Sequence, residues 1–422
     1  MLGLWLARRL CSSIWARVRL RSPYFSQNLS RNLACLAKKG ELPRAFRGTT
    51  LSFVDQRAEA VIAHLTGAGY ARCEPPILQP ASIFFDSGED LRGQLYLTSD
   101  LSGADYCLRP EYTIPVLVAY LATECAGERA RFSYCGPVFR FLPGRPSEFT
   151  QAGIESFGRA DREAADAEIL ALALEAADAA NQHQAAPSRL MVRIGDAGLF
   201  SWLLEALDLP PQWRRRIAHG HSQGKSLDTI LSPGLHGTDH SGVLAVLEGA
   251  DKQGARALVE DLLSIAGVAP AGGRSPGEIA DRFLEQAALK AGSGFSAEKR
   301  AVIEQFLGVE GGPDQASAQL RALAAGANLD LSAALDSFDK RLGFIAAQGL
   351  DAARLHFAAR FTGNLDYYTG FVFEAHEQGA AEPAIGGGRY DQLPQTLGAD
   401  KPIAAVGAAI WIGRLSAERV AP

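Results

Sequence analysis

Two strand-like segments joined by a short turn constrain the fold of this chain more than any other feature. "FSYCGPVFRF" (132–141) and "FTQAGIESFG" (149–158) are separated by a Pro- and Gly-rich turn from Leu142 to Ser147. This arrangement predicts two adjacent antiparallel strands. Gln151 and Glu155 lie four positions apart on the second segment, so strand alternation puts both side chains on one face of the sheet. The fold therefore has to accommodate polar groups on a sheet face.

The rest of the chain adds helices and further strands to this pair. Hydrophobic periodicity predicts helices over 52–66, 113–125, 161–182 and 199–207, and strand formers predict a hairpin over 95–108 and strands over 190–196, 371–375 and 403–406. Residues 209–350 are rich in Ala, Leu and Gly, and predict a mainly helical insertion. We expect an α+β fold in which an antiparallel sheet with flanking helices is built from residues 48–208 and 351–422.

The first 47 residues differ in composition from the rest. They contain ten Lys or Arg residues and one acid, Glu41, and the first 40 residues are rich in Arg, Ser and Leu. A targeting peptide has this composition, and so does a translated segment upstream of a true start codon. Both readings stay open, and we expect residues 1–47 to lie outside the fold.

Charge and cysteine usage restrict the partners and the compartment. Residues 48–422 carry 32 basic and 46 acidic residues, a net charge of −14, so we expect no nucleic-acid partner. No apolar run approaches the ~18 residues of a membrane span. None of the six cysteines forms a Cys-x-x-Cys pair, and none follows Cys135. This pattern favours a cytoplasmic protein without disulfides, a zinc site or another cofactor.

Several polar clusters interrupt the apolar segments and are candidates for a site. Glu111 follows Arg109-Pro110, Asp366 stands beside Tyr367 and Tyr368, and "RYD" at 389–391 follows three glycines. Buried acids need a partner or a ligand. One reading is a pocket for a cationic or zwitterionic small molecule. The other is that Glu111 and Glu155 pair with Arg109 or Arg140, and spacing alone favours neither reading.

Five motifs in order resemble those of the class II histidyl-tRNA synthetase family. They are "RPEYT" (109–113), "FRFLPGRPSEFTQAGIESFG" (139–158), "LDYY" (365–368), "GGGRYDQL" (386–393) and "VGAAIWIGRL" (406–415). "GYARCEPPILQP" (69–80) is similar to the first motif of that fold, with Pro76 in the dimer-interface position. The resemblance covers about residues 50–205 and 355–415, and it implies a class II antiparallel core that forms homodimers.

The resemblance also implies a histidine pocket. The matching positions are Glu111, Thr113, Gln151, Glu155, Tyr368 and Tyr390, with Arg140, Asp366 and Tyr367 as further candidates. Carboxylates suit an α-ammonium group, and an acid with a phenol suits the two imidazole nitrogens. We therefore expect Glu155 and Tyr390 to contact the imidazole.

Departures from the synthetase motifs argue against aminoacylation. Gly363 stands where the synthetases have an arginine that stabilises charge during adenylate formation, and Leu142 replaces an acid in a shortened loop. Trp411 replaces a small residue beside the adenine, although Arg414 is kept. Only seven residues follow Leu415, so we expect no anticodon-binding domain. We expect no catalytic residue.

The retained pocket and the lost chemistry resemble the regulatory subunits of ATP phosphoribosyltransferase. That resemblance implies a non-catalytic chain that binds and activates the short catalytic subunit and transmits feedback inhibition by histidine. The alternatives are a diverged histidyl-tRNA synthetase and a free-standing histidine sensor. The histidines of "AHGH" (218–221) and "HGTDH" (236–240) are expected in loops, without a metal ion.

Overall fold

The computed structural model describes residues 50–85, 89–181, 190–231, 257, 296–363 and 365–415. Its large sheet consists of β1 (Ala71–Arg72), β5 (Ala130–Phe139), β6 (Glu148–Phe157), β7 (Met191–Asp196), β8 (Glu310–Gly311), β9 (Leu355–Ala358), β10 (Phe371–His376), β11 (Ile385–Arg389) and β12 (Ala405–Trp411). The strand order is β1-β5-β6-β12-β11-β10-β7-β9-β8. Every pairing from β5 to β7 is antiparallel, and parallel pairs occur where β1 joins β5 and β7 joins β9.

A second, three-stranded sheet contains the predicted hairpin. It consists of β2 (Leu78–Pro80), β3 (Leu97–Ser99) and β4 (Asp105–Leu108), in the order β2-β4-β3. Strands β3 and β4 pair antiparallel, with Thr98 opposite Tyr106. The hairpin predicted over 95–108 is therefore present.

The helices that the sequence predicts in the core are present, with ends that shift by a few residues. The helices are α3 (Thr50–Gly67), α4 (Glu89–Arg92), α5 (Thr113–Leu121), α6 (Arg162–Ala180), α7 (Ala197–Ala206), α8 (Pro211–Ser222), α9 (Leu227–Leu231), α13 (Ala297–Leu307), α14 (Pro313–Gly326), α15 (Ser332–Ala347) and α16 (Leu393–Thr396). The start of α7 is set by Asp196, whose carboxylate accepts hydrogen bonds from the amides of Gly198 (2.8 Å) and Leu199 (3.2 Å). Within the described residues, no helix combines the length and apolar character needed to cross a bilayer.

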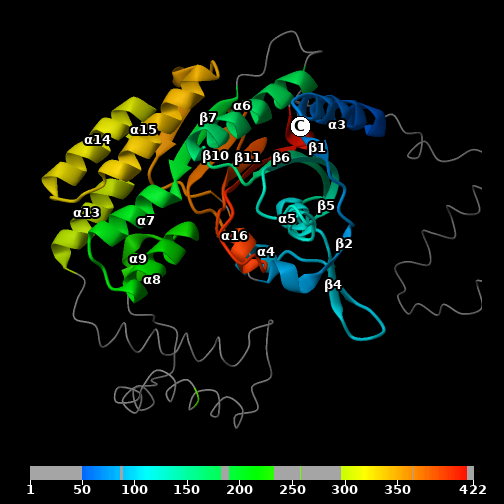
Figure 1. The fold of residues 1–422 in the computed structure, drawn as a ribbon, viewed down its shortest axis with the longest axis horizontal. Coiled ribbons are helices and arrows are strands. Elements are labelled where there is room, and N and C mark those ends of the chain that lie inside the picture. The colour runs from blue at the N-terminus through cyan, green and yellow to red at the C-terminus, as the bar shows by residue number, and fades with distance from the viewer. Residues whose placement is uncertain are drawn as a thin grey trace, which may run out of the picture. The chain divides into compact units, whose positions relative to one another are not determined.

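The two faces of the large sheet carry different layers. On β6, Ala152 and Ile154 join a large hydrophobic cluster with residues of α6, α7 and α15. Helix α6 lies along this face, and α15 packs beside it against β9 and β10 (Figure 1). Gln151 and Glu155 point to the opposite face, where α5 packs together with Tyr134, Phe157 and Tyr390. The predicted alternation on β6 therefore decides which face receives the polar residues.

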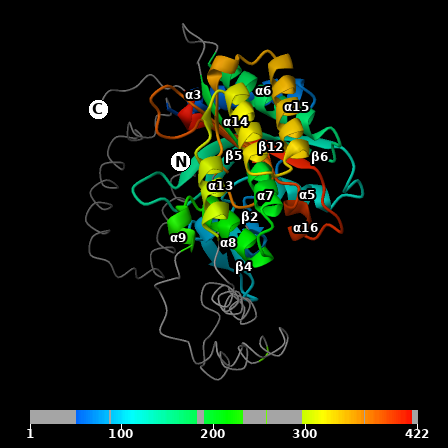
Figure 2. The same cartoon turned by 90° about the vertical axis from the view of Figure 1, so that its left-hand side faces the viewer.

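The described part of residues 209–350 is helical except for β8 and its connections. Helices α13, α14 and α15 stand side by side (Figure 2). Leu335, Phe338 and Ile345 of α15 are buried in the same cluster as the sheet residues beneath α6. These helices thus extend the core of the sheet. The boundaries at 208 and 350 stay a prediction.

Two features differ from the sequence-based expectation. Strand β11 runs through Gly386, Gly387 and Gly388, a segment without strand formers, because it is hydrogen-bonded on both sides by β10 and β12. His219 and His221 lie in α8, so the expected loop is wrong at these two positions. Residues 236–240 lie outside the described residues.

Candidate ligand-binding site

A cavity of about 350 Å³, called the first cavity below, lies on the α5 side of the large sheet. Strands β6, β10, β11 and β12 all contribute to its lining, and its volume is typical of a small-molecule site. Seven of the nine predicted site residues line it: Glu111, Thr113, Arg140, Gln151, Tyr367, Tyr368 and Tyr390. Residues from four distant parts of the chain are thereby brought together.

Glu111 occupies the start of α5. Its carboxylate accepts hydrogen bonds from the backbone amides of Thr113 (2.6 Å) and Ile114 (2.8 Å). Burial raises the pKa of Glu111, while these amides and the positive charge of Arg140 oppose the rise. Glu111 therefore fixes the first turn of α5 and also presents a carboxylate to the first cavity.

Glu155 lies behind the first cavity and does not line it. Its side chain is fully buried, with Oε1 accepting a hydrogen bond from the Thr113 hydroxyl (2.8 Å) and Oε2 accepting one from the Tyr390 hydroxyl. Burial raises the pKa of Glu155 to about 8. A Cβ atom at Gly407, opposite Glu155 on β12, would overlap Oε2. Glycine at 407 is what makes room for this acid.

The alternative that Glu111 and Glu155 are held by ion pairs does not match the geometry. Arg109 donates instead to the carbonyl oxygens of Pro75 (2.6 Å) and Pro137 (2.9 Å). Arg140 donates its Nε–H to the carbonyl oxygen of Pro110 (2.7 Å). In the part of the chain that the structure describes, neither acid forms a salt bridge. Arg140 keeps part of its guanidinium at the cavity wall.

Three tyrosines form one side of the site. Tyr367 meets Tyr368 and Tyr390 edge to face, with ring centroids 5.3 and 5.7 Å apart. Burial raises the pKa of all three phenols, so they are neutral hydrogen-bonding groups at physiological pH. Asp366, by contrast, is exposed and does not line the first cavity. Asp366 lies in a turn and is absent from the cavity lining, although its neighbours Leu365 and Tyr367 belong to it.

Gly363 lines the first cavity with a backbone φ of +79°. A Cβ atom there would lie 2.7 Å from Cδ2 of Tyr368. A side chain of any size at this position therefore requires both an unfavourable backbone conformation and a displaced Tyr368. Asn364, the next residue in the motif, lies outside the described residues.

The outer wall of the first cavity is formed by Trp411 and its neighbours. The indole lines the cavity, and the guanidinium carbon of Arg414 lies 4.6 Å from the ring centroid. The carboxylate of Glu382 forms ion pairs with Arg414 (3.0 Å) and with Arg145, which lies in the turn between β5 and β6. The indole lies over Gly386 of β11, where an added Cβ atom would be 3.1 Å from Cη2 of the ring.

Two lining acids were not predicted from the sequence. Glu374 on β10 is mostly buried, and its Oε2 lies 3.3 Å from Nε2 of His376. An acid that interrupts the apolar strand "FVFEAH" is a signal that could have revealed it. Glu382 lies in the loop between β10 and β11 and has no comparable signal. The site thus offers carboxylates for an ammonium group, and Arg140 for a carboxylate.

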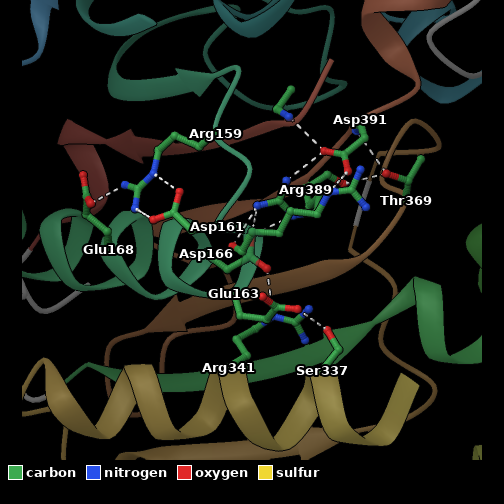
Figure 3. Close-up of polar contacts among 12 residues, drawn as sticks. Arg159, Asp161, Glu163, Asp166, Glu168, Ser337, Arg341, Thr369, Arg389 and Asp391 are labelled. Atoms are coloured by element: carbon green, nitrogen blue, oxygen red, sulfur yellow. Dashed lines mark hydrogen bonds and ion pairs between the residues drawn. The ribbon is translucent and has the colours of Figure 1, made fainter. Parts of the chain in front are cut away.

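A buried ion network holds the strand end that carries Tyr390. Arg389 donates to Asp166 on α6 (2.6 and 2.9 Å) and to Asp391 (2.8 Å) (Figure 3). Asp166 also accepts from Arg341 on α15 (2.8 Å), which donates to Asp196 (2.7 Å). Arg389 therefore points away from the first cavity and anchors β11 to two helices.

Known proteins match this chain along most of its length. A family model described as "Histidyl-tRNA synthetase" matches residues 51–271 and 254–415. An ATP phosphoribosyltransferase regulatory subunit from Mesorhizobium japonicum is 40% identical over 375 residues, which cover 86% of this chain and 99% of the relative. One from Brucella ovis is 39% identical over 353 residues, covering 82% and 92%.

Two solved structures share the fold at low sequence identity. A structure described as an ATP phosphoribosyltransferase regulatory subunit/histidyl-tRNA synthetase from Bacillus halodurans has a TM-score of 0.58 and 20% identity, covering 89% of this chain and 82% of that chain. Histidyl-tRNA synthetase from Nostoc sp. PCC 7120 has a TM-score of 0.55 and 17% identity, covering 89% and 74%. The architecture is therefore the class II fold of the histidyl-tRNA synthetases. With relatives of about 40% identity over nearly their whole length, the chain belongs to the family of ATP phosphoribosyltransferase regulatory subunits.

Proposed function

We propose that this chain is a non-catalytic regulatory subunit that binds histidine in the first cavity and transmits its occupancy to a short ATP phosphoribosyltransferase catalytic subunit. The family assigns the chain a regulatory role in histidine biosynthesis. The observation that carries the proposal is the convergence of Glu111, Thr113, Gln151, Tyr368 and Tyr390 on one cavity.

The chemistry of the lining supports free histidine as the ligand. Glu111 and Glu374 are suitably charged for the α-ammonium group, and Arg140 for the α-carboxylate. The buried pair of Glu155 and Tyr390 supplies a neutral acid and a phenol near the end of the cavity, and both suit an imidazole. Glu155 does not line the first cavity, so direct contact between its carboxyl group and the imidazole requires the side chains around it to shift.

Residues at the wall of the first cavity support the proposal that this chain does not form an adenylate. Trp411 takes up space at the wall of the first cavity, and the ring of Tyr368 blocks a side chain at position 363. Without a cation at this point, the charge that develops during adenylate formation lacks its usual stabilisation. We therefore propose that the chain has no activity of its own.

A pocket that binds a ligand but catalyses no reaction suggests that the chain acts on a second protein. Occupancy of such a pocket matters only where a partner responds differently to the bound and free states. We propose that this partner is the short catalytic subunit, which the regulatory chain activates and histidine then inhibits. A homodimer formed through the segment around Pro76 would provide the two-fold base of the assembly.

Histidine binding is tested by calorimetry and by thermal unfolding of the purified chain. A ligand that binds only the folded state raises the melting temperature. Millimolar histidine is expected to raise it, and Glu155→Ala is expected to weaken binding by ~1 to 3 kcal/mol because an imidazole donor loses its acceptor. An unchanged melting temperature in histidine, together with no heat of binding, would disprove the histidine site.

The regulatory role is tested by mixing the chain with the short catalytic subunit from the same genome. Phosphoribosyl transfer is expected to rise on mixing and to fall when histidine is added. Glu155→Ala is expected to raise the histidine concentration that gives half-inhibition. If histidine binds but the two proteins elute separately and the rate stays constant, the free-standing sensor becomes the better assignment.

A further inference from the structure

A second cavity, of about 720 Å³, lies on the other side of Arg140 and Gly363. Its lining combines the end of α8 and the loop that follows it, residues 360–363 after β9, and Arg193 of β7. Arg140 and Gly363 line both cavities. None of the residues proposed for histidine, apart from the further candidate Arg140, belongs to the lining of the second cavity.

The residues that line the second cavity carry a positive net charge, whereas the chain as a whole is negatively charged. Four permanent cations line it, Arg140, Arg193, Lys225 and Arg360, and no lining residue is an acid. Among the described residues, Arg193, Lys225 and Arg360 form no ion pair; the guanidinium of Arg193 packs instead over the ring of Phe361, at 4.6 Å from its centroid. Cations gathered around a cavity without acids repel one another until an anion neutralises them.

His221 is a second, independent polar group in the lining of the second cavity. The residue lines the second cavity, yet it is only 6% exposed. Its Nε2 atom has no hydrogen-bond partner in the described part of the chain. A buried polar atom without a partner in the protein is rare, and the position of Nε2 at the second cavity lets a bound molecule or a water supply that partner.

We propose that the second cavity binds an oligophosphate anion, either free pyrophosphate or the phosphate chain of a nucleotide. Guanidinium groups bind phosphate oxygens in pairs, and Lys225 adds a compact charge. The volume is about twice that of the first cavity, and four cations line it, so a ligand with several charges fits better than a single carboxylate. This assignment goes beyond the histidine-sensing function and does not depend on it.

The shared wall predicts coupling between the two cavities. Arg140 supplies one guanidinium to both, so a ligand that draws it toward one cavity changes its position in the other. Coupling of this kind is reciprocal: the factor by which histidine changes oligophosphate affinity equals the factor by which oligophosphate changes histidine affinity.

The test is calorimetric titration of the full chain with pyrophosphate and with ATP, in a chloride buffer of low ionic strength. Saturable binding at one site per chain is expected. Lys225→Gln with Arg360→Gln removes two exposed cations, and we expect at least about a tenfold loss of affinity. Tighter binding of ATP than of pyrophosphate assigns the site to a nucleotide, and the reverse order assigns it to free oligophosphate.

A matched control separates a built site from general surface charge. Arg72→Gln with Lys401→Gln also removes one exposed arginine and one exposed lysine, neither of which lines the first or the second cavity. The control pair is expected to keep the wild-type affinity within about twofold. The proposal is overturned if neither anion binds saturably, or if both double variants lose affinity equally. The thermal unfolding transition without added ligand reports whether each variant is folded, and single Lys225→Gln replaces the double variant if that one fails.

Discussion

The hydroxyl of Tyr390 on the C-terminal side of β11 donates a hydrogen bond to Oε2 of Glu155 on β6, across the intervening strand β12. Thr113 at the start of α5 donates to the other oxygen of the same carboxyl group. The acid thus joins two strands and a helix behind the first cavity, and burial there favours its protonated form.

Stability should depend on pH through Glu155. Its pKa is raised from 4.5 to about 8, so between these values the folded chain holds a proton that the unfolded chain releases. The stabilisation from this proton is full below pH ~4.5 and is lost as the pH rises to ~8, with a slope of at most roughly 1.4 kcal/mol per pH unit. Glu155→Gln should flatten this decline in urea unfolding at pH 5 to 8. Equal slopes in both proteins would show that Glu155 keeps an ordinary pKa.

Removal of the Tyr390 hydroxyl should destabilise the chain. Tyr390→Phe leaves Oε2 of Glu155 without its donor in a fully buried place, and we expect a loss of ~1 to 3 kcal/mol in the free energy of unfolding. Tyr106→Phe is the matched control, because that partly exposed phenol lies on β4, away from the first cavity. The role given to the Tyr390 hydroxyl is wrong if both variants unfold at the same urea concentration.

Gly363 should tolerate no side chain without cost. Gly363→Ala meets both an unfavourable φ of +79° and the ring of Tyr368, whereas Gly103→Ala meets a similar φ of +84° with no atom within 4 Å. The difference between the two variants isolates the contact with Tyr368. We expect the unfavourable backbone conformation to lower the free energy of unfolding of both variants by ~1 kcal/mol, and the contact with Tyr368 to lower that of Gly363→Ala further. Thermal unfolding of the two variants measures this difference.

Restoring the synthetase arginine should not restore adenylate formation. Gly363→Arg forces Tyr368 to move, and Trp411 still lines the first cavity. Histidine-dependent exchange between ATP and pyrophosphate should therefore stay at the level of a no-enzyme control in both the natural chain and the variant. Exchange above that level in the natural chain would reinstate the synthetase alternative.

The ion network around Asp166 should contribute strongly to stability. Asp166→Asn leaves Arg389 and Arg341 without their shared carboxylate in a buried place, which typically costs ~3 to 5 kcal/mol. Asp336→Asn removes an exposed partner of Arg321 and should change the free energy of unfolding little. Chemical denaturation compares the two. A small effect of Asp166→Asn would mean that Asp391 and Asp196 suffice to hold the two arginines.

The sequence determined the elements and most of the site. Alternation in "FTQAGIESFG" placed Gln151 and Glu155 on one sheet face, whereas the grouping of the nine candidate residues, seven of which line the first cavity, came from the resemblance to the synthetase motifs. The alternation is local, because side-chain direction along a strand follows from position alone. The same rule gave no information on Asp366, which lies in a turn where alternation does not hold.

Only the tertiary structure decided what the polar residues do. Thr113 and Tyr390 reach Glu155 from 42 and 235 positions away, and Gly407 on a third strand leaves space for the acid. The cluster of cations in the second cavity likewise joins residues from β7, the loop after α8 and the segment after β9. Burial, a raised pKa and a shared cavity wall arise from packing between distant segments, whereas strand and helix patterns arise from neighbours along the chain.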